Sequence, residues 1–356
     1  MNKNRIDAIT GLRGLAALLV LYAHLAERAW HNPDQHFPGE VGVAIFFSLS
    51  GFLISYLYRE KNFSRHCVAD YVTARIARIA PAYLSVVLAS YFIYMVIDPH
   101  FIYAISTANL ARHLVFSGNV SALWSIAPEV QFYVLFLLVW AVNYRWTKQA
   151  DYVSMLLLAL LFIIMLTFRD GFPGTFVGAK LHYFVFGAIA GAIRAKIDGA
   201  TQDNISVSVL HLLLLGMMAA VACNLIAFPF TDKSDFYQSI PTALLSSLFV
   251  LSFSLPSPVA RILLGNRFMT LCGECSFSIY LLNLPIIYVF QKMGLGLPSA
   301  ILSMSIILVV LALSWVNYQL IERPGARSIR ALSARIASAF SRQAGSAQPA
   351  GPNLPA

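Results

Sequence analysis

The sequence is dominated by long apolar runs, separated by charged residues and turn formers. A run of about 20 apolar residues, coiled as an α-helix, matches the ~30 Å hydrocarbon core of a bilayer. Reading these runs against the Gly, Pro and charged positions predicts ten membrane spans. The predicted spans cover residues 8–28, 41–58, 79–97, 123–142, 152–168, 181–197, 206–228, 239–257, 271–290 and 298–320. The pattern therefore predicts an all-α fold, a polytopic transmembrane helical bundle of about ten helices.

The composition supports this class of protein. Hydrophobic residues make up 58% of the chain and charged residues only 12%, about half of the roughly 25% usual in globular proteins. Such a chain cannot build a polar coat, which excludes soluble enzymes, secreted disulfide scaffolds and nucleic-acid-binding proteins. The net charge of +9 does not alter this conclusion, because the charges lie in short loops and the tail. Of four scattered cysteines, only Cys272 and Cys275 have a redox-like spacing, and a role for this pair is not favoured.

The distribution of basic residues predicts the orientation. An even number of spans places both termini on one side of the membrane. With the N-terminus inside, 18 Lys and Arg residues lie on the inner side and six on the outer side, so both termini are predicted to be cytoplasmic. Lys3 and Arg5 precede the first apolar run, but the run contains charged positions and lacks a small-x-small cleavage site. The first segment is therefore expected to be retained rather than cleaved as a signal peptide.

The chain divides into three predicted regions, with a membrane-embedded domain over residues 1–324. In residues 325–342, apolar side chains recur at helical spacing opposite arginines, which suits an amphipathic helix on the anionic inner leaflet. A cytoplasmic extension that frays is an equally good interpretation. Residues 343–356 are rich in Ala, Gly and Pro and are expected to be disordered.

Ionisable residues inside a span are costly, about 2.5 to 3.5 kcal/mol at the bilayer centre, so they are candidates for function. The first span holds Arg13 and His24. Their separation of eleven residues is three helical turns plus about 20°, so they share one helix face about 16 Å apart along the axis. A lone histidine in a span is commonly a packed, hydrogen-bonded residue. The shared face with Arg13 favours a functional pair.

A second cluster begins at Trp124 and Ser125 and continues through Glu129 to Tyr133. Much of it is explained as a helix start, with Ser125 as N-cap and Glu129 favoured by the helix dipole. In the predicted topology Glu129 lies at the same outer depth as His24. A carboxylate there would orient a histidine that acts as a general base towards a hydroxyl.

Other polar positions carry weaker signals. His182, Tyr280 and Asn283 lie at comparable outer depth, where each alone is more typical of packing than of chemistry. Arg75 and Arg78 lie three residues apart on one helical face at the inner side, and arginine forks match phosphate oxygens. On spacing alone, ordinary positive-inside anchoring explains them as well. No His, Cys, Asp or Glu spacing argues for a metal site, and none is expected.

Six segments of the chain match a known family in the order in which that family carries them, over residues 5–324. They are Arg13-x10-His24, residues 42–54, Arg75-x-x-Arg78, Trp124-Ser125 with Glu129 and Phe132-Tyr133, Phe277-Ser-Ile-Tyr-Leu281, and Ile321-Glu-Arg-Pro324. With these segments the chain resembles acyltransferase family 3, the bacterial integral membrane O-acyltransferases that modify surface polysaccharides, lipopolysaccharide and Nod factors. No further domain follows in this sequence, so the membrane-only form of the family is expected.

The resemblance implies transfer of an acyl group, usually acetyl, from cytoplasmic acyl-coenzyme A to a sugar hydroxyl on the outer side of the bacterial inner membrane. In that family the Arg and His of the first span are the catalytic pair, so these roles pass to Arg13 and His24. The inner Arg-x-x-Arg lies near the donor, which makes Arg75 and Arg78 candidates for the coenzyme A phosphates. Asn283 departs from the family, because many relatives have His there, and this leaves His24 as the better base.

These roles combine into a hypothesis. His24, oriented by Glu129, deprotonates a sugar hydroxyl, Arg13 stabilises oxyanion charge or positions the thioester, and acetyl-CoA is the donor. The acceptor is a surface polysaccharide, a lipopolysaccharide or a lipid-linked sugar. Residues expected on the acceptor side are Trp124, Ser125, Tyr133, His182, Tyr280 and Asn283. The 16 Å between Arg13 and His24 leaves two routes open, direct transfer along a deeply threaded donor or an acyl-enzyme relay. Membrane lipids are expected as partners, and the sequence allows a homodimer.

Two other classes of function stay open at this point. A secondary transporter would use Arg13, His24 and Glu129 as a proton or substrate path. The absence of a convincing repeat between residues 1–170 and 171–320 counts modestly against it. A binding or assembly subunit of an export machine would need no chemistry of its own.

Overall fold

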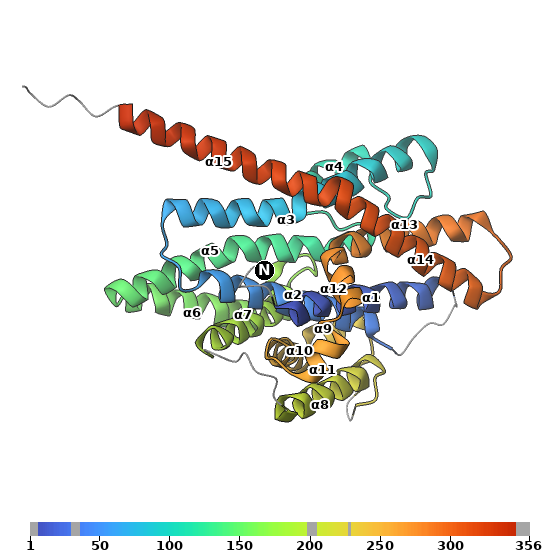
Figure 1. The fold of residues 1–356 in the computed structure, drawn as a ribbon, viewed down its shortest axis with the longest axis horizontal. Coiled ribbons are helices and arrows are strands. Elements are labelled where there is room, and N and C mark those ends of the chain that lie inside the picture. Colours follow the sequence, from blue (N-terminus) through green and yellow to red (C-terminus); the bar gives the residue numbers. More distant parts are fainter. Residues whose placement is uncertain (1–5, 30–35, 198–204, 227–228, 347–356) are drawn as a thin grey trace, which may run out of the picture.

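The computed structural model describes residues 6–29, 36–197, 205–226 and 229–346, and in these ranges the regular structure is helical, without a strand. The longer helices are α1 (Asp7–Ala29), α2 (Pro38–Tyr58), α3 (Arg65–Phe92), α5 (Ile126–Gln149), α6 (Tyr152–Thr167), α7 (Leu181–Lys196), α8 (Ile205–Ala222), α10 (Ile240–Phe253), α13 (Ser276–Met293), α14 (Ser299–Asn317) and α15 (Arg323–Ser346). Short helices are α4 (Thr107–Leu114), α9 (Lys233–Gln238), α11 (Pro258–Leu263) and α12 (Arg267–Glu274). Figure 1 shows α3, α5 and α2 in successive layers, with α15 along the outside of α3. The predicted all-α helical bundle is confirmed.

Six stretches of helix are long and apolar enough to cross a membrane, namely Asp7–Arg28, Pro38–Tyr58, Arg65–Ile97, Ser121–Gln149, Ile205–Ala222 and Ser299–Ala339. A seventh is obtained if α12 and α13, which meet at an angle of 74°, form one broken span. The spans predicted at 152–168, 181–197 and 239–257 correspond to the shorter helices α6, α7 and α10. The count of ten spans and the cytoplasmic termini therefore stay predictions.

Close helix packing centres on α2, which contacts α1, α7 and α10. Glycines make the contact with α7 possible. A Cβ at Gly187 would collide with the carbonyl of Ser48, and one at Gly191 with the carbonyl of Phe52. Gly51 meets the backbone of Phe184 from the other side in the same way. These three glycines are thus packing residues, which allow two backbones to approach within a membrane.

The helix α15 continues the last apolar helix instead of starting anew. A π-helical turn, Tyr318–Glu322, joins α14 to α15, and α15 then packs along α3. Gly325 lies against Pro81, and the hydroxyls of Thr73 and Ser333 are 2.8 Å apart. The helix predicted for residues 325–342 is present but docked on the bundle, and it includes the first four residues of the predicted tail. Residues 347–356 lie outside the described residues.

The helix α13 is interrupted in its hydrogen bonding by Pro285, which cannot donate to the carbonyl of Leu281. The phenol of Tyr103 donates to that carbonyl over 3.1 Å and replaces the missing bond. Tyr103 is fully buried and comes from the loop that follows α3. This contact fixes the part of α13 that carries Tyr280 and Asn283.

Candidate active site

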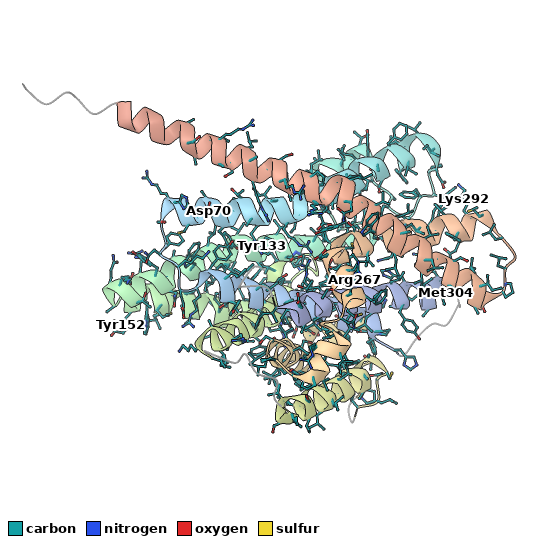
Figure 2. All side chains as sticks on the ribbon, viewed as in Figure 1. Asp70, Tyr133, Tyr152, Arg267, Lys292 and Met304 are labelled. Carbon is teal, nitrogen blue, oxygen red and sulfur yellow. The ribbon has the colours of Figure 1, made fainter. Side chains whose placement is uncertain are left out.

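Two neighbouring cavities in the bundle contain most of the candidate residues. The first, here called the arginine cavity, has a volume of about 210 Å³ and lies between α1, α2, α3, α5, α13 and α15. The predicted residues that line it are Arg13, Arg75, Arg78, Ser125, Glu129, Tyr133 and Tyr280. Figure 2 shows Tyr133 in the interior of the bundle, whereas Asp70 and Lys292 lie at its periphery. Packing therefore brings together seven residues that come from four helices and from the short turn Ser121–Ser125.

Arg13 projects from α1 into the arginine cavity. Its Nη2 donates to the hydroxyl of Ser276, the first residue of α13, over 3.1 Å. A glycine beside it lets α1 approach α12 closely, because a Cβ at Gly14 would collide with the backbone of α12. Arg13 therefore faces the cavity while holding the start of α13.

Arg75 is a half-buried cation without a carboxylate partner among the described residues. Three tyrosine rings surround its guanidinium, those of Tyr58, Tyr71 and Tyr133, at 5.9, 5.8 and 5.5 Å from ring centroid to Cζ. Cation–π contacts of this kind stabilise the charge, and the guanidinium also hydrogen-bonds the side chain of Tyr58. The Nε atom is buried and lacks a hydrogen-bond partner within the described residues. A buried donor left unpaired is costly, so this side chain suits an anionic ligand in the cavity.

Arg78, in contrast to Arg75, forms a salt bridge with a carboxylate. Its Nη1 lies 2.6 Å from Oε1 of Glu322, which is only 4% exposed. The second oxygen of Glu322 accepts from Ser278 over 3.0 Å, and Asn317 donates to the same serine over 2.9 Å. Arg78 lines the cavity, but its charge is neutralised by this network. Of the two arginines predicted to hold phosphates, only Arg75 has its charge available.

Replacing Arg78 by Ala should lower the free energy of unfolding by about 3 kcal/mol, because the Glu322 carboxylate would stay buried without its cation. We expect the double variant Arg78→Met with Glu322→Leu to recover most of this loss, since neither charge is then left unpaired. Chemical unfolding of the purified protein in detergent measures both values. A single variant as stable as the wild type would contradict a structural role of the pair.

Glu129 also belongs to the arginine cavity. Its Oε1 accepts hydrogen bonds from Ser50 and Tyr133, both at 2.6 Å. The prediction that Glu129 orients His24 is wrong, because Glu129 lies on the arginine side and its bonds go to α2 and to the next turn of α5. For the same reason Tyr133, predicted on the acceptor side, lies beside Arg75.

The second cavity, here called the histidine cavity, has a volume of about 220 Å³. His24, Trp124 and Tyr280 line it. His24 Nδ1 lies 2.7 Å from Oδ1 of Asn283. The amide nitrogen of Asn283 donates to the carbonyls of Ile279 and Tyr280 over 3.0 and 2.9 Å, which fixes the amide orientation. Its oxygen therefore faces His24, so Nδ1 carries the proton and Nε2 keeps a free lone pair.

A lysine joins three helices at the histidine cavity. Lys233 of α9 contacts Glu27 of α1 at 2.5 Å and Glu40 of α2 at 3.2 Å. Burial by itself would lower the pKa of Lys233, but the hydrogen bond with Glu27 and the charges of Glu27 and Glu40 raise it. Lys233 therefore stays charged at neutral pH, and its ion pairs join α9 to α1 and α2 at the wall of the cavity. Nothing in the local sequence pairs these three residues.

The two cavities meet at Tyr280 and Val43, which line both. The phenol of Tyr280 donates to the carbonyl of Ala122 over 2.7 Å, so the hydroxyl of Ser125, also at 2.7 Å, donates to the phenol. Tyr280 and Ser125 thus form a polar wall between the side of Arg75 and the side of His24. The separation of Arg13 and His24 along one helix is explained by this division.

His182 lies outside both cavities. It is 1% exposed, and its Nε2 lies 3.0 Å from the carbonyl of Tyr237, to which it donates. The prediction that His182 binds substrate is therefore not supported by its position, because α7 presents it to the backbone of α9. No group of three or more metal-ligating side chains occurs in the described ranges.

Sequence reasoning missed several residues of the site. Glu322 was visible as the acid of the Ile-Glu-Arg-Pro segment, but its partner lies 244 positions earlier. Arg330 of α15 lines the arginine cavity, and its neighbours in the sequence suggested only an interfacial helix. Ser50 carried no signal beyond its place in an apolar span. Their roles follow from packing alone.

A helical membrane bundle with an oriented histidine and a half-buried arginine that has no carboxylate partner among the described residues has the parts of a membrane-embedded group-transfer enzyme. Comparison with known proteins identifies the group that is transferred. Residues 6–318 match the acyltransferase domain of acyltransferase family 3, so the chain belongs to this family of membrane acyltransferases. Membership favours an enzyme over the transporter and the assembly subunit.

Known relatives share this domain. The chain is 24% identical to O-acetyltransferase OatA of Staphylococcus aureus over an alignment of 353 residues, covering 90% of this chain and 57% of the relative. It is 27% identical to acyltransferase MdmB of Streptomyces mycarofaciens over 152 residues, covering 37% of this chain and 38% of MdmB. The chain thus spans little more than half the length of OatA. No solved structure matches the chain.

Proposed function

We propose that the chain transfers an acetyl group from acetyl-CoA to a hydroxyl of a carbohydrate at the bacterial inner membrane. The acceptor is a surface polysaccharide, a lipopolysaccharide or a lipid-linked sugar. The observation that carries the proposal is the pair of adjoining cavities, one with a guanidinium whose buried Nε has no hydrogen-bond partner among the described residues and the other with an oriented imidazole. An anionic donor fits the first cavity and a neutral hydroxyl fits the second. The relation to OatA supports acetyl as the group.

In this proposal Arg75 and Arg330 bind the donor. Arg78 stabilises the wall of the cavity through its salt bridge with Glu322. Arg75 supplies an unpaired Nε inside a tyrosine cage, and Arg330 stands on the exposed face of α15 at the cavity. Guanidinium forks bind phosphate oxygens bidentately. When bound, the donor supplies an activated thioester carbonyl.

His24 acts as the general base. Its Nε2 accepts the proton of the acceptor hydroxyl, the oxygen forms the new ester bond, and the carbon–sulfur bond breaks. The imidazolium then returns the proton to the departing thiolate, so the charges balance. Asn283 holds the required tautomer through Nδ1. Arg13, on the same face of α1 but in the arginine cavity, positions the donor thioester.

Tyr280 and Ser125 stand between the donor and the acceptor, which leaves direct transfer and a relay as two routes. Direct transfer requires the Tyr280 ring to move aside. A relay would use the Ser125 hydroxyl as carrier, because it lines the arginine cavity and bonds to the residue that borders both cavities.

Incubation of the protein in nanodiscs with radiolabelled acetyl-CoA, with and without cell-envelope glycan, tests the function. We expect label to enter the glycan. Label on the protein without glycan would favour the relay and should be lost in Ser125→Ala. Absence of label from both glycan and protein, with the protein folded and the donor intact, would contradict acetyl transfer.

A further inference from the structure

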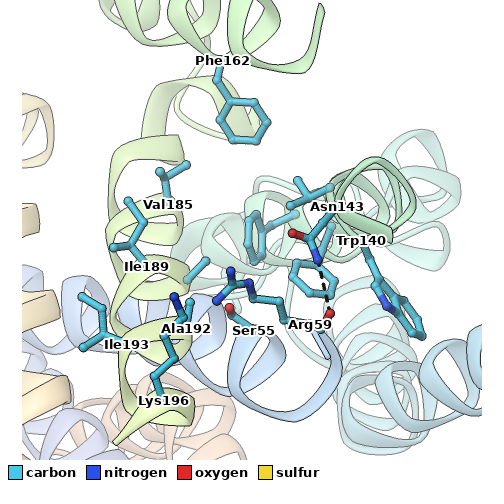
Figure 3. Close-up of a pocket in the computed structure, with 14 residues that line it drawn as sticks. Ser55, Arg59, Trp140, Asn143, Phe162, Val185, Ile189, Ala192, Ile193 and Lys196 are labelled. Atoms are coloured by element: carbon cyan, nitrogen blue, oxygen red, sulfur yellow. Dashed lines mark hydrogen bonds between the residues drawn. The ribbon is translucent and has the colours of Figure 1, made fainter. Parts of the chain in front are cut away.

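A third cavity lies apart from the two described above, between α2, α5, α6 and α7 (Figure 3). Its volume of about 360 Å³ exceeds those of the arginine and histidine cavities, and it shares no lining residue with either. Pockets that hold small ligands have volumes of about 300 to 1,000 Å³. The cavity is therefore large enough for a ligand and separate from the proposed reaction.

The walls of this cavity are almost entirely apolar. One wall is a single face of α7, on which the lining positions recur at helical spacing from Val185 to Lys196. The opposite wall is aromatic and aliphatic and comes mainly from α5, with Phe162 added by α6.

The length of the cavity matches one leaflet of a membrane. Val185 and Lys196 are eleven residues apart on α7, about 16 Å along the helix axis. Half of the ~30 Å hydrocarbon core is about 15 Å. Ile189 and Ile193 of α7 are 50% and 45% exposed, so the cavity borders a lipid-facing surface. A hydrocarbon chain can enter it from the bilayer.

One end of the cavity is cationic. Arg59 lies just past the end of α2 and Lys196 ends α7, and Figure 3 shows both far from Phe162. Asn143 beside them donates to the backbone carbonyl of Arg59 over 3.4 Å. The lining includes no acidic residue, and in the described part of the chain no carboxylate pairs with either cation. The two positive charges are therefore available to an anionic head group.

We propose that this cavity binds an anionic phospholipid, with one acyl chain between α5 and α7 and the phosphate between Arg59 and Lys196. The apolar walls of the cavity would hold the acyl chain of the lipid, because each buried CH₂ group contributes favourably to the free energy of binding. The cationic end accounts for the preference for a negative head group. The bound lipid would fill the space that separates α6 from α7.

Binding of two lipids to delipidated protein tests the proposal. Dioleoylphosphatidylglycerol and dioleoylphosphatidylcholine have the same chains and differ in net charge, and native mass spectrometry measures both affinities. For the wild type we expect about tenfold tighter binding of the anionic lipid. The double variant Arg59→Gln with Lys196→Gln should bind both lipids about equally. Lys148→Gln, which removes a basic residue of α5 outside the cavity, should retain the preference.

Filling the cavity gives a second, independent test. Ala192→Trp places a large ring inside the apolar wall and should weaken the binding of both lipids. Since the double charge variant leaves the walls unchanged, it serves as the test even if the Trp variant fails to fold. Retention of the anionic preference in the double variant, or wild-type binding by a folded Ala192→Trp, would overturn the proposal. Neither measurement depends on acyl transfer, so the lipid-binding proposal is tested independently of the enzyme function.

Discussion

Replacing His24 by Ala should lower the rate of acyl transfer by about a thousandfold, because general-base catalysis contributes about 10² to 10⁴. The helix should still form, since Ala has a higher helix propensity than His. Initial rates of label transfer in nanodiscs, at saturating donor, measure the loss. His66→Ala is a matched control, because His66 lies on α3 with an exposed side chain and, among the described residues, forms an ion pair with Asp70, which is also exposed. Residual transfer above about a tenth of the wild-type rate by folded His24→Ala would exclude His24 as the base.

A substitution at Asn283 tests whether this residue acts through the tautomer of His24 or only through packing. Asn283→Leu keeps the branched shape of the side chain but removes the acceptor that holds the proton on Nδ1 of His24. The imidazole could then present either tautomer to the hydroxyl. In metal sites, loss of such an orienting partner of a histidine commonly costs about 10- to 100-fold in activity, and we expect a loss of this order here. If the tautomer matters, kcat should fall while the KM for acetyl-CoA is unchanged.

Replacing Arg75 by Gln should raise the KM for acetyl-CoA by about 10- to 100-fold, with kcat less affected. A hydrogen bond to a charged group is worth about 1.5 to 3 kcal/mol, and Arg75 lines the arginine cavity with an Nε donor that has no partner among the described residues. Steady-state kinetics with purified protein measure the change. Arg65→Gln is the matched control, because Arg65 begins the same helix and does not line the cavity.

Comparing acetyl-CoA with a second donor identifies the phosphate group that Arg75 contacts. Acetyl-dephospho-CoA lacks the 3′-phosphate, so a contact with that group predicts that Arg75→Gln has little further effect on this donor. An equal loss with both donors would assign Arg75 to the diphosphate. An unchanged KM with both would contradict donor binding by Arg75. The same comparison for Arg330→Gln shows whether α15 contributes to the donor site.

The structure alters the interpretation of the Arg-x-x-Arg pair. Spacing made Arg75 and Arg78 equivalent, since both lie on one face of one helix. Their surroundings differ, because Arg78 meets the carboxylate of Glu322 and Arg75 meets three tyrosine rings. The π-helical turn at Tyr318–Glu322 precedes α15 and contains Glu322. Such turns recur at functional sites, and here the turn supplies the partner of Arg78.

The sequence by itself determined the class of protein, the helical fold and the shared face of Arg13 and His24. These properties follow from local rules, because a helix satisfies its own backbone hydrogen bonds and fixes which residues share a face. The ordered motifs also indicated the acyltransferase family. Each of these conclusions needs only residues that are near in the chain or a pattern along it.

Only the tertiary structure decided which helix faces meet. His24 and Asn283 are 259 positions apart, and Arg78 and Glu322 are 244 apart. Glu129, predicted beside His24, is hydrogen-bonded to Ser50 in the structure. His182 lies outside both cavities, and Arg330 lines the arginine cavity. Such pairings depend on how glycine-mediated contacts and bent helices orient one helix against another. The spacing of residues within a helix carries no information about that orientation.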